Sequence, residues 1–261
     1  MSEQFDLRFG GTKRLYGNEA VEKLASSHVC VVGIGGVGSW AAEALARSGV
    51  GEITLIDLDD ICTTNINRQI HALTDTVGQS KVEVMAQRVR GINPDCKINE
   101  VEDFVDANNL SELITKEMDY VIDAIDSIKA KVALIAYCKR YKIKIITVGG
   151  AGGQQDPTQV QIADLAKTVQ DPLAAKVRSE LRRFHNFSKN PKRRFQVECV
   201  FSTEHLMYPT SDGSVCAQKS QADGPMKMDC ASGFGAATVV TASFGFVAVA
   251  RVIKKLTTVA K

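Results

Sequence analysis

The sequence predicts an α/β fold: a mostly parallel sheet with helices on both faces, and antiparallel additions in the C-terminal half. Three observations support this prediction. Apolar runs typical of buried strands alternate with segments of helical periodicity up to residue 150. The first apolar run leads through a glycine-rich turn into a helix. Beyond residue 158, two further strand-like segments depart from the alternation.

The alternation begins with HVCVVGIGG at residues 28–36 and EITLIDLDD at residues 52–60, both typical of buried strands. Between them, residues 37–51 show helical periodicity, and the predicted helix ends at Gly49. Strands that alternate with helices indicate a parallel sheet covered on both faces. The same criteria predict helix 80–94 (stopped by Pro94), strand 96–104, a short helix near 106–116, strand 120–126, helix 127–142, strand 143–150, and the antiparallel additions 158–165 and 195–202.

Length and composition restrict the function classes only weakly. With 261 residues, 44 % of them hydrophobic, the chain can bury one large domain with an appended lobe. A formal net charge of +2 neither requires nor excludes a polyanionic partner. The seven cysteines form no C-x-x-C pair and have no histidine at zinc spacing, which disfavours a zinc site or a disulfide framework. Since the N-terminus shows no secretory signal, these features predict a cytoplasmic protein.

Residues 230–250 are uncharged and long enough to span a bilayer. They are rich in Gly, Ala, Ser and Thr, which pack closely against protein. We therefore expect a buried or interface helix here, and membrane association is the disfavoured alternative.

The turn after the first strand matches G-x-G-x-x-G through Gly33, Gly35 and Gly38, and Gly36 belongs to the same loop. Glycines let the backbone approach a phosphate closely, and the following helix presents N–H groups and the positive end of its dipole. Asp57 ends the second strand, where a carboxylate can hold ribose hydroxyls. These features predict a Rossmann-like nucleotide site. By themselves they leave an NAD-dependent oxidoreductase open.

Polar and basic residues after the second strand favour ATP over a dinucleotide. ATP has a longer and more highly charged phosphate chain than the pyrophosphate of NAD, and Arg and Lys side chains neutralise such charge. The alternative for isolated basic residues is a solvated surface position. The nucleotide-contacting residues predicted beyond the glycine loop are Asp57, Asp59, Asn65, Arg68, Gln69 and Lys81.

Two aspartates, Asp123 and Asp126, come at the carboxyl end of the strand predicted at 120–126. Carboxylates at this edge of a parallel sheet face the ligand crevice, and Mg²⁺ on a triphosphate needs one or two such oxygens. Asp126 is therefore the predicted magnesium ligand. Its alternative role is that of N-cap for the next helix, which Ser127 could share.

These patterns suggest three parts of the chain. We expect an N-terminal arm over residues 1–27, a nucleotide-binding Rossmann-like region over 28–157, and a C-terminal part over 158–261 with a basic segment and a core or dimer helix. The arm contains RFGGTKRLYG at residues 8–17, which is basic and contains two adjacent glycines. By itself, this composition indicates a flexible, glycine-hinged terminus.

Four stretches together resemble the ubiquitin-activating-enzyme-like superfamily of ThiF, MoeB and HesA proteins, which adenylate carboxylates: GIGGVGSWAAEALARSGVG, LIDLDDICTTNINRQIH, VGQSK and VIDAIDS. Within it, RFGGTKRLYG, GGAGGQQDPTQVQIADLAKT and MDCASGFGAATVV resemble most closely the branch that modifies threonylcarbamoyladenosine in tRNA. The resemblance covers nearly the whole chain. The paired C-x-x-C zinc ligands of many relatives are absent, which disfavours activation of a ubiquitin-like sulfur carrier.

The resemblance implies a Rossmann-like adenylation domain in a homodimer. It implies ATP-dependent dehydration of threonylcarbamoyladenosine, next to the tRNA anticodon, to its cyclic form through an acyl-adenylate. Arg14, at the position of the family's basic arm, is expected to reach the phosphates bound by the other subunit. Arg68, Lys81 and Mg²⁺ on Asp126 would also offset charge on the departing pyrophosphate. Cys230 is a further candidate, because relatives that transfer acyl groups use a cysteine thioester; a buried structural thiol is the alternative.

Residues 176–194 form a basic segment with eight Lys or Arg residues and one Glu, a net charge of +7, so the rest of the chain is net acidic. Concentrated positive charge is typical of phosphate-backbone binding, with a solvated helix face as the alternative. Phe184, Phe187 and Phe195 either stack on unpaired anticodon bases or belong to the core. The predicted RNA-contacting residues are Arg182, Arg183, Lys189, Lys192, Arg193 and Arg194.

Two other function classes stay open at this point. An NAD-dependent oxidoreductase would bind NAD and release no pyrophosphate. A non-enzymatic activator or binding partner of a sulfur-carrier system would keep all its activity and binding in Lys81→Ala and Asp126→Ala variants. A SufE-like sulfur-transfer protein is a further candidate partner of the adenylating enzyme, and DNA is not an expected partner.

Overall fold

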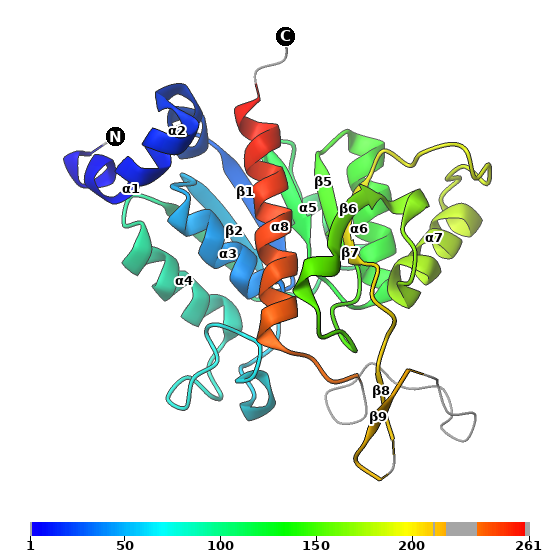
Figure 1. Cartoon of the computed structure of the whole chain (residues 1–261). Helices are drawn as coiled ribbons and strands as arrows, with labels where there is room; N and C mark the ends of the chain where they lie inside the picture. The colour runs from blue at the N-terminus through cyan, green and yellow to red at the C-terminus, as the bar shows by residue number, and fades with distance from the viewer. Residues whose placement is uncertain (1, 211, 218–233, 259–261) are drawn as a thin grey trace.

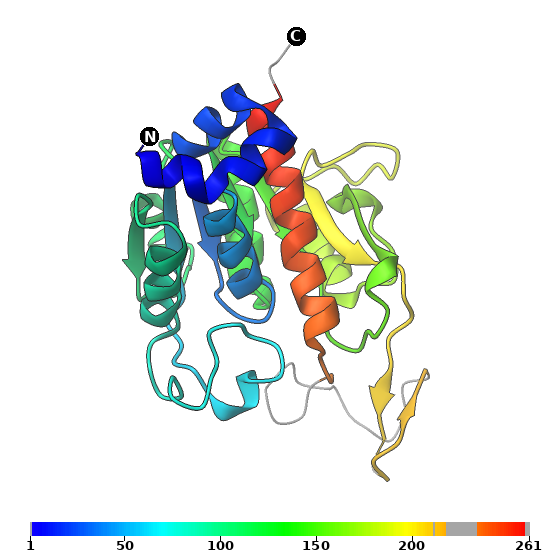
Figure 2. The ribbon, with the colours of Figure 1, turned by 60° about the vertical axis from the view of Figure 1, so that its left-hand side comes forward.

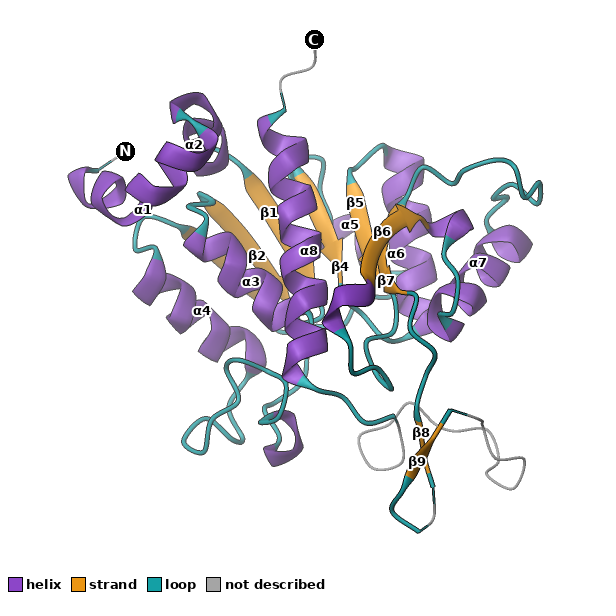
Figure 3. Ribbon diagram, viewed as in Figure 1, coloured by secondary structure: helices purple, strands orange, loops and turns teal. Residues whose placement is uncertain are grey.

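The computed structural model describes residues 2–210, 212–217 and 234–258. In these ranges, helices cover both faces of a seven-stranded sheet (Figure 1; Figure 3). The sheet strands are β1 (His28–Val32), β2 (Glu52–Ile56), β3 (Lys97–Val101), β4 (Tyr120–Asp123), β5 (Ile145–Val148), β6 (Val160–Asp164) and β7 (Glu198–Ser202). The α-helices are α1 (Glu3–Tyr16), α2 (Asn18–Ala25), α3 (Gly38–Arg47), α4 (Lys81–Ile92), α5 (Leu110–Leu113), α6 (Ile128–Tyr141), α7 (Pro172–Phe184) and α8 (Thr238–Thr257).

The strands lie in the order β3-β2-β1-β4-β5-β7-β6, which confirms the mostly parallel sheet. Only β6 is antiparallel to its neighbour β7 within this sheet. The prediction that the segment 195–202 is also antiparallel is wrong, because β7 runs parallel to β5. The helix α7 lies between β6 and β7 along the chain and returns it to the amino edge of the sheet, where a parallel strand has to start. A separate antiparallel pair, β8 (Tyr208–Pro209) with β9 (Val215–Cys216), lies outside the sheet.

Two apolar cores fill the space between the sheet and its helices. One lies under α3, α4 and α8, and the other under α5, α6 and α7. The strands β4 and β5 are buried along their whole length, which explains their unbroken apolar sequences. The predicted buried helix in 230–250 is found from Thr238 onwards, where α8 packs on α3 and contributes Phe244, among other residues, to the core. Among the described residues, no helix is long and apolar enough to cross a membrane.

The N-terminal arm is helical and packed on its own subunit, so the prediction of a glycine-hinged arm is wrong for the subunit's own fold. Helix α1 continues through Gly10 and Gly11, and the chain turns instead at Gly17, whose φ is +87°. Phe5 and Phe9 are buried, because both rings pack against the turn at Gly49. As Figure 2 shows, α1 and α2 lie at one end of the sheet, and the loops that follow β1 and β2 lie at the other.

Candidate active site

The strand order reverses at β1, which pairs with β2 on one side and β4 on the other. The loops after β1 and β4 meet at the carboxyl edge of the sheet. Gly33 has a φ of +87°, and a Cβ at this position would lie 2.9 Å from the carbonyl oxygen of Ala124. A Cβ on Gly38 would lie 1.7 Å from the carbonyl oxygen of Gly33. Both glycines are therefore required for this packing, at the place where open α/β sheets bind their ligands.

The start of α3 and two orphaned polar atoms fit a phosphate-bearing ligand. No side chain caps α3, so the positive end of its dipole is left to a ligand. Ser39 Oγ, in the first turn, is buried without a hydrogen-bond partner among the described residues, and so is Gln69 Oε1. The side chain of Gln69 lies against the glycine loop, 3.9 Å from where a Cβ of Gly35 would be. Buried polar atoms without partners call for a bound ligand or water.

The segment after β2 folds back over the glycine loop and brings Arg68 beside it. The Cγ and Cδ of Arg68 lie 3.3 Å and 3.4 Å from the position of a Cβ on Gly36. Its guanidinium donates to the carbonyl oxygen of Thr64 at 2.7 Å and to Asn67 Oδ1 at 3.0 Å. Asn65 is buried and uses Oδ1 to accept from the Cys62 N–H at 3.0 Å, which stabilises the turn that precedes Arg68.

Asp57, Asp59 and Lys81 form a charged group next to the loop. Asp57 accepts from the N–H of Ile34 at 2.5 Å and from the N–H of Asp59 at 2.9 Å. Lys81 Nζ lies 2.7 Å from Asp59 Oδ2 and 3.8 Å from Asp57 Oδ1. Burial raises the pKa of Asp57, and the Lys81 charge opposes this shift. Lys81 is only 5 % exposed, so it is not the solvated surface residue of the alternative interpretation.

The two aspartates after β4 face different environments. Asp126 is exposed and forms no hydrogen bond or ion pair with the residues described, so its carboxylate is available to a ligand. Ser127, not Asp126, occupies the N-cap position of α6, and no side chain bonds to that helix end. Asp123 is fully buried, and its carboxylate lies 2.9 Å from Lys131 Nζ. The expectation that Asp123 faces the crevice is therefore wrong, because its carboxylate is buried against Lys131, a residue that no sequence motif singles out.

Arg14 lies on α1, at the opposite edge of the sheet from the glycine loop of its own chain (Figure 2). Its side chain is exposed, and NH1 lies 3.6 Å from the position of a Cβ on Gly10. Within one subunit, Arg14 and the glycine loop are not brought together. Cys230, the other predicted catalytic residue, lies outside the described residues.

The basic segment, residues 176–194, covers most of α7 and the greater part of the loop that leads to β7. Five of its six predicted RNA-contacting residues are exposed, and Arg182 is half-buried, with its guanidinium 5.3 Å from the Phe195 ring centroid. Phe195 is 4 % exposed and Phe187 packs against it, so stacking on RNA is wrong for Phe195. Phe184 is 58 % exposed and lies under Arg183. Of these three phenylalanines, Phe184 is therefore the one whose ring is exposed enough to meet a base.

A buried histidine near this site gives the fold a pH dependence. Both ring nitrogens of His71 are buried and without a hydrogen-bond partner among the described residues. Burial, together with the charges of Lys81 and Arg88, lowers the pKa of His71 to about 4. The histidine is therefore neutral in the folded protein at neutral pH.

We expect the His71→Leu variant to lose part of the acid sensitivity of the wild type. The unfolded chain binds the His71 proton near pH 6.5 and the folded protein near pH 4, so wild-type stability should fall as the pH drops through this window. Urea unfolding at pH 7 and pH 5 measures the change in the free energy of unfolding, which should be smaller in the variant. His185→Leu, at an exposed histidine, is the control. Equal acid sensitivity in all three proteins would contradict a buried neutral His71.

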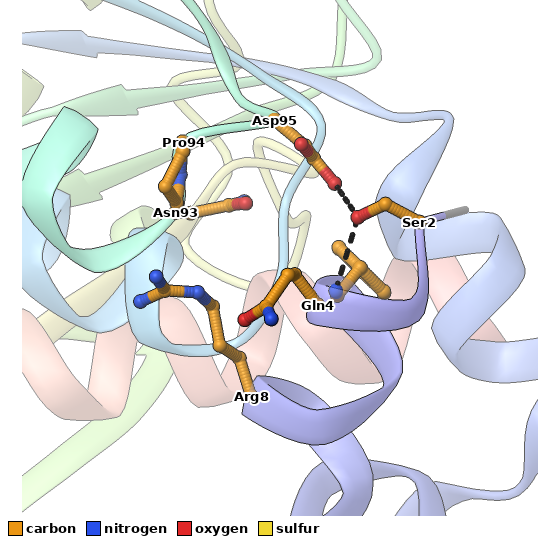
Figure 4. Close-up of a pocket in the computed structure, with 7 residues that line it drawn as sticks. Ser2, Gln4, Arg8, Asn93, Pro94 and Asp95 are labelled. Carbon is orange, nitrogen blue, oxygen red and sulfur yellow. Dashed lines mark hydrogen bonds between the residues drawn. The ribbon is translucent and has the colours of Figure 1, made fainter.

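A cavity of about 310 Å³ lies away from this site, between α1 and the turn that joins α4 to β3 (Figure 4). Its lining includes Arg8, Asn93 and Asp95, and Ser2 Oγ donates to Asp95 Oδ2 at 2.5 Å across it. No predicted site residue lines this cavity. Among the described residues, no group of three or more His, Cys, Asp or Glu side chains is placed to hold a metal ion.

Comparisons with known proteins agree with this architecture. The model of the ThiF family matches residues 11–261. The chain is 62 % identical to tRNA threonylcarbamoyladenosine dehydratase of Escherichia coli (strain K12), over 98 % of this chain and 96 % of that protein. Crystal structures of E. coli tRNA N6-threonylcarbamoyladenosine dehydratase in complex with ATP and with AMP both match with a TM-score of 0.87, at 56 % and 57 % identity, over 98 % of this chain and 96 % of each solved chain.

Proposed function

The chain belongs to the ThiF family, and from this premise we propose that it is an ATP-dependent tRNA-modifying enzyme. It dehydrates threonylcarbamoyladenosine, next to the tRNA anticodon, to its cyclic form through an acyl-adenylate. The observation that carries this proposal is the 62 % identity, over nearly the whole chain, to a dehydratase of that substrate. A solved dehydratase of the same fold binds ATP, in keeping with the bare end of α3 and the orphaned polar atoms at the carboxyl edge.

The chemistry follows from the poor reactivity of a carboxylate, whose negative charge is delocalised and whose leaving group would be oxide. The substrate carboxylate attacks the α-phosphorus of ATP, the bond to pyrophosphate breaks, and an acyl-adenylate forms. Lys81, Arg68 and Arg14 of the partner subunit offset the charge that grows on the pyrophosphate. The carbamoyl group then attacks the acyl carbonyl, AMP leaves, and the net change is the loss of one water. Ring closure is intramolecular, so the protein mainly positions the groups and excludes bulk water.

We propose Asp126 as the protein ligand of Mg²⁺. Its carboxylate is exposed and unpaired within the described part of the chain, at the end of β4 where the crevice begins. Mg²⁺ on a triphosphate takes one or two protein carboxylates and keeps phosphate oxygens and waters as its other ligands, so the donor set fits. When bound, the ion would supply positive charge next to the phosphates.

We also propose a homodimer, because Arg14 lies at the amino edge of its own sheet and only a second subunit brings it to a glycine loop. Four further predictions accord with this proposal and stay predictions. They are a SufE-like partner, a role for Cys230, a cytoplasmic location, and contacts of the nucleotide with Asp57, Asp59, Asn65 and Gln69.

The decisive experiment supplies ATP and Mg²⁺ with tRNA that does or does not carry the threonylcarbamoyl group. We expect AMP and pyrophosphate to form only with the modified tRNA, and the modified nucleoside to lose the mass of one water in the digested product. Reduction of NAD without pyrophosphate release would instead favour the oxidoreductase. Unchanged ATP and tRNA in every mixture would favour a binding module.

The basic segment should make tRNA binding strongly dependent on salt. In a Lys192→Ala, Arg193→Ala, Arg194→Ala triple variant, we expect the slope of log affinity against log salt to become shallower by about 2 to 3, because each lost phosphate contact removes about 0.7 to 0.9 from it. Filter binding over a range of KCl concentrations measures this slope. Lys116→Ala, at an exposed lysine outside the segment, is the control and should leave the slope unchanged. A triple variant with the wild-type slope would show that this surface does not bind RNA.

A further inference from the structure

Asp171 joins α7, which belongs mostly to the basic segment, to the crevice at the carboxyl edge of the sheet. It is the N-cap of α7, where Oδ1 accepts from the N–H of Ala174 at 2.8 Å. Its other oxygen, Oδ2, accepts from the N–H of Gly150 at 3.0 Å. Gly150 follows β5, so it lies at the same edge as the glycine loop and Asp126. One carboxylate thus fixes both the start of α7 and the loop after β5.

The fit of this carboxylate is tight. Asp171 is 5 % exposed, and a Cβ on Gly149 would lie only 1.7 Å from its Oδ2. Any residue other than glycine at 149 would push the carboxylate away. Packing as well as hydrogen bonding therefore constrains the position of α7 relative to the loop after β5.

A buried ion pair connects the same place to the loop that holds Asp126. Lys131 Nζ lies 2.9 Å from Asp123 Oδ1 and donates to Thr147 Oγ1 at 3.0 Å, and its charge acts on Asp171. Thr147 in turn donates to Asp123 Oδ2 at 2.6 Å. Asp123 accepts from the N–H of Ile125 at 3.2 Å, in the turn immediately before Asp126. The ends of β4 and β5 and the start of α7 are thus linked by one network of buried polar groups.

The other end of α7 lies far from the crevice. The helix has 13 residues, so it is about 20 Å long. It leads into residues 185–197, which reach the start of β7 at the amino edge of the sheet, because β7 is parallel to β5 (Figure 1). Most of the exposed basic residues of the basic segment lie on this loop. The N-terminal end of α7 therefore borders the crevice, and its C-terminal end leads into the exposed basic residues of the basic segment. Asp171, as the N-cap, fixes where the helix begins.

We propose that Asp171 is a positioning residue for the reaction. Its carboxylate holds α7 and the loop after β5 in one relative arrangement. This arrangement presents the carboxylate and the carbamoyl group of the substrate correctly to ATP. This inference rests on the proposed function. Asp171 touches neither ATP nor tRNA in this role. It acts through the placement of α7 and the loop after β5.

Loss of this placement has a chemical signature. When the carbamoyl group is displaced from the acyl-adenylate, water attacks the acyl carbonyl instead. The bond from that carbonyl to the phosphate oxygen then breaks, AMP leaves, and the original carboxylate is regenerated. ATP is consumed without ring closure, so the amount of AMP formed per cyclic nucleoside rises above one.

The test uses Asp171→Ser, because serine remains a good N-cap for α7 but is too short to reach Gly150 as well. With ATP, Mg²⁺ and threonylcarbamoylated tRNA, we expect the KM for ATP and the Kd for tRNA to stay near wild type. We expect kcat for formation of the cyclic nucleoside to fall by about tenfold or more, because displacing reacting groups by up to about 1 Å can lower a rate by as much as about 10²-fold. The ratio of AMP to cyclic nucleoside should rise. In Asp171→Asn, which keeps one acceptor oxygen, both effects should be smaller.

The matched control is Asp119→Ser. Asp119 also accepts from a backbone N–H distant in sequence, that of His28 at 3.0 Å, but at the amino edge of the sheet and outside the basic segment. This variant should keep the wild-type ratio of AMP to product even where its Tm falls.

A wild-type ratio and kcat in Asp171→Ser would overturn the inference, and so would a loss confined to tRNA affinity or Tm. Should the serine variant not fold, the asparagine variant decides by the same ratio. Failure of the proposed function itself looks different, because the wild-type enzyme would then form no cyclic nucleoside.

Discussion

Replacing Lys81 with alanine should lower kcat for tRNA dehydration by about 10²- to 10³-fold, the loss typical of removing one preorganised electrostatic contact. Lys81 is 5 % exposed and its ammonium is held between Asp59 and Asp57, so its position is fixed before ATP binds. Its charge matters most when the pyrophosphate departs. The effect should therefore fall on kcat more than on the KM for ATP, and rapid-quench measurement of pyrophosphate formation in a single turnover reports it directly.

The control for this variant is Lys97→Ala. Lys97 also pairs with a carboxylate, Glu52 at 2.8 Å, but its side chain is 69 % exposed and it lies at the start of β3, away from the crevice. An exposed pair of this kind contributes at most about 1 kcal/mol, so turnover should stay at the wild-type level. If Lys81→Ala also kept its turnover within a few-fold, the phosphate-binding role of Lys81 would be wrong.

Replacing Arg14 with alanine should reduce turnover by a comparable factor, roughly 10²- to 10³-fold, because it removes a second charge from the leaving pyrophosphate. The side chain is exposed in its own subunit, so its loss leaves no unpaired buried group and should change the Tm little. Arg8→Ala on the same helix is the control. The Arg8 guanidinium donates to the Ile92 carbonyl oxygen of its own chain at 3.3 Å, so its loss should affect stability rather than turnover.

A mixture of Arg14→Ala and Lys81→Ala proteins separates action in trans from action within one subunit. In a mixed dimer, one site combines the intact Lys81 of the first variant with the intact Arg14 of the second. After random exchange of equal amounts of subunits in a two-fold symmetric dimer, about a quarter of all sites are complete. Activity should therefore return to roughly that fraction of wild type. If Arg14 acted within its own subunit, no site would be complete and the mixture would stay as inactive as either variant alone.

The local parts of this fold and site could be predicted because each has a short-range signal. The turn through Gly33 and Gly38 is marked by glycine spacing, and the order of strands and helices is marked by apolar periodicity. Arg68 and Gln69 could be placed near the loop because the carboxyl ends of neighbouring parallel strands share one edge. The Asp–Pro pair at 171–172 is itself a start signal for a helix, but the second hydrogen bond of Asp171, to Gly150, has no local signature.

The sequence by itself determined the α/β class, the glycine loop and the set of charged residues available for ATP and RNA, because backbone conformation and burial pattern depend on neighbours within a few positions. Only the tertiary structure decided that Asp123 turns inward to Lys131, that β7 runs parallel to β5, and that Phe5 and Phe9 fasten the N-terminal helix to the turn at Gly49. It also decided that α1, the helix that carries Arg14, lies at the end of the sheet opposite the loops that follow β1 and β2. These outcomes depend on contacts between residues that pack together only after the chain has folded, so no local pattern encodes them.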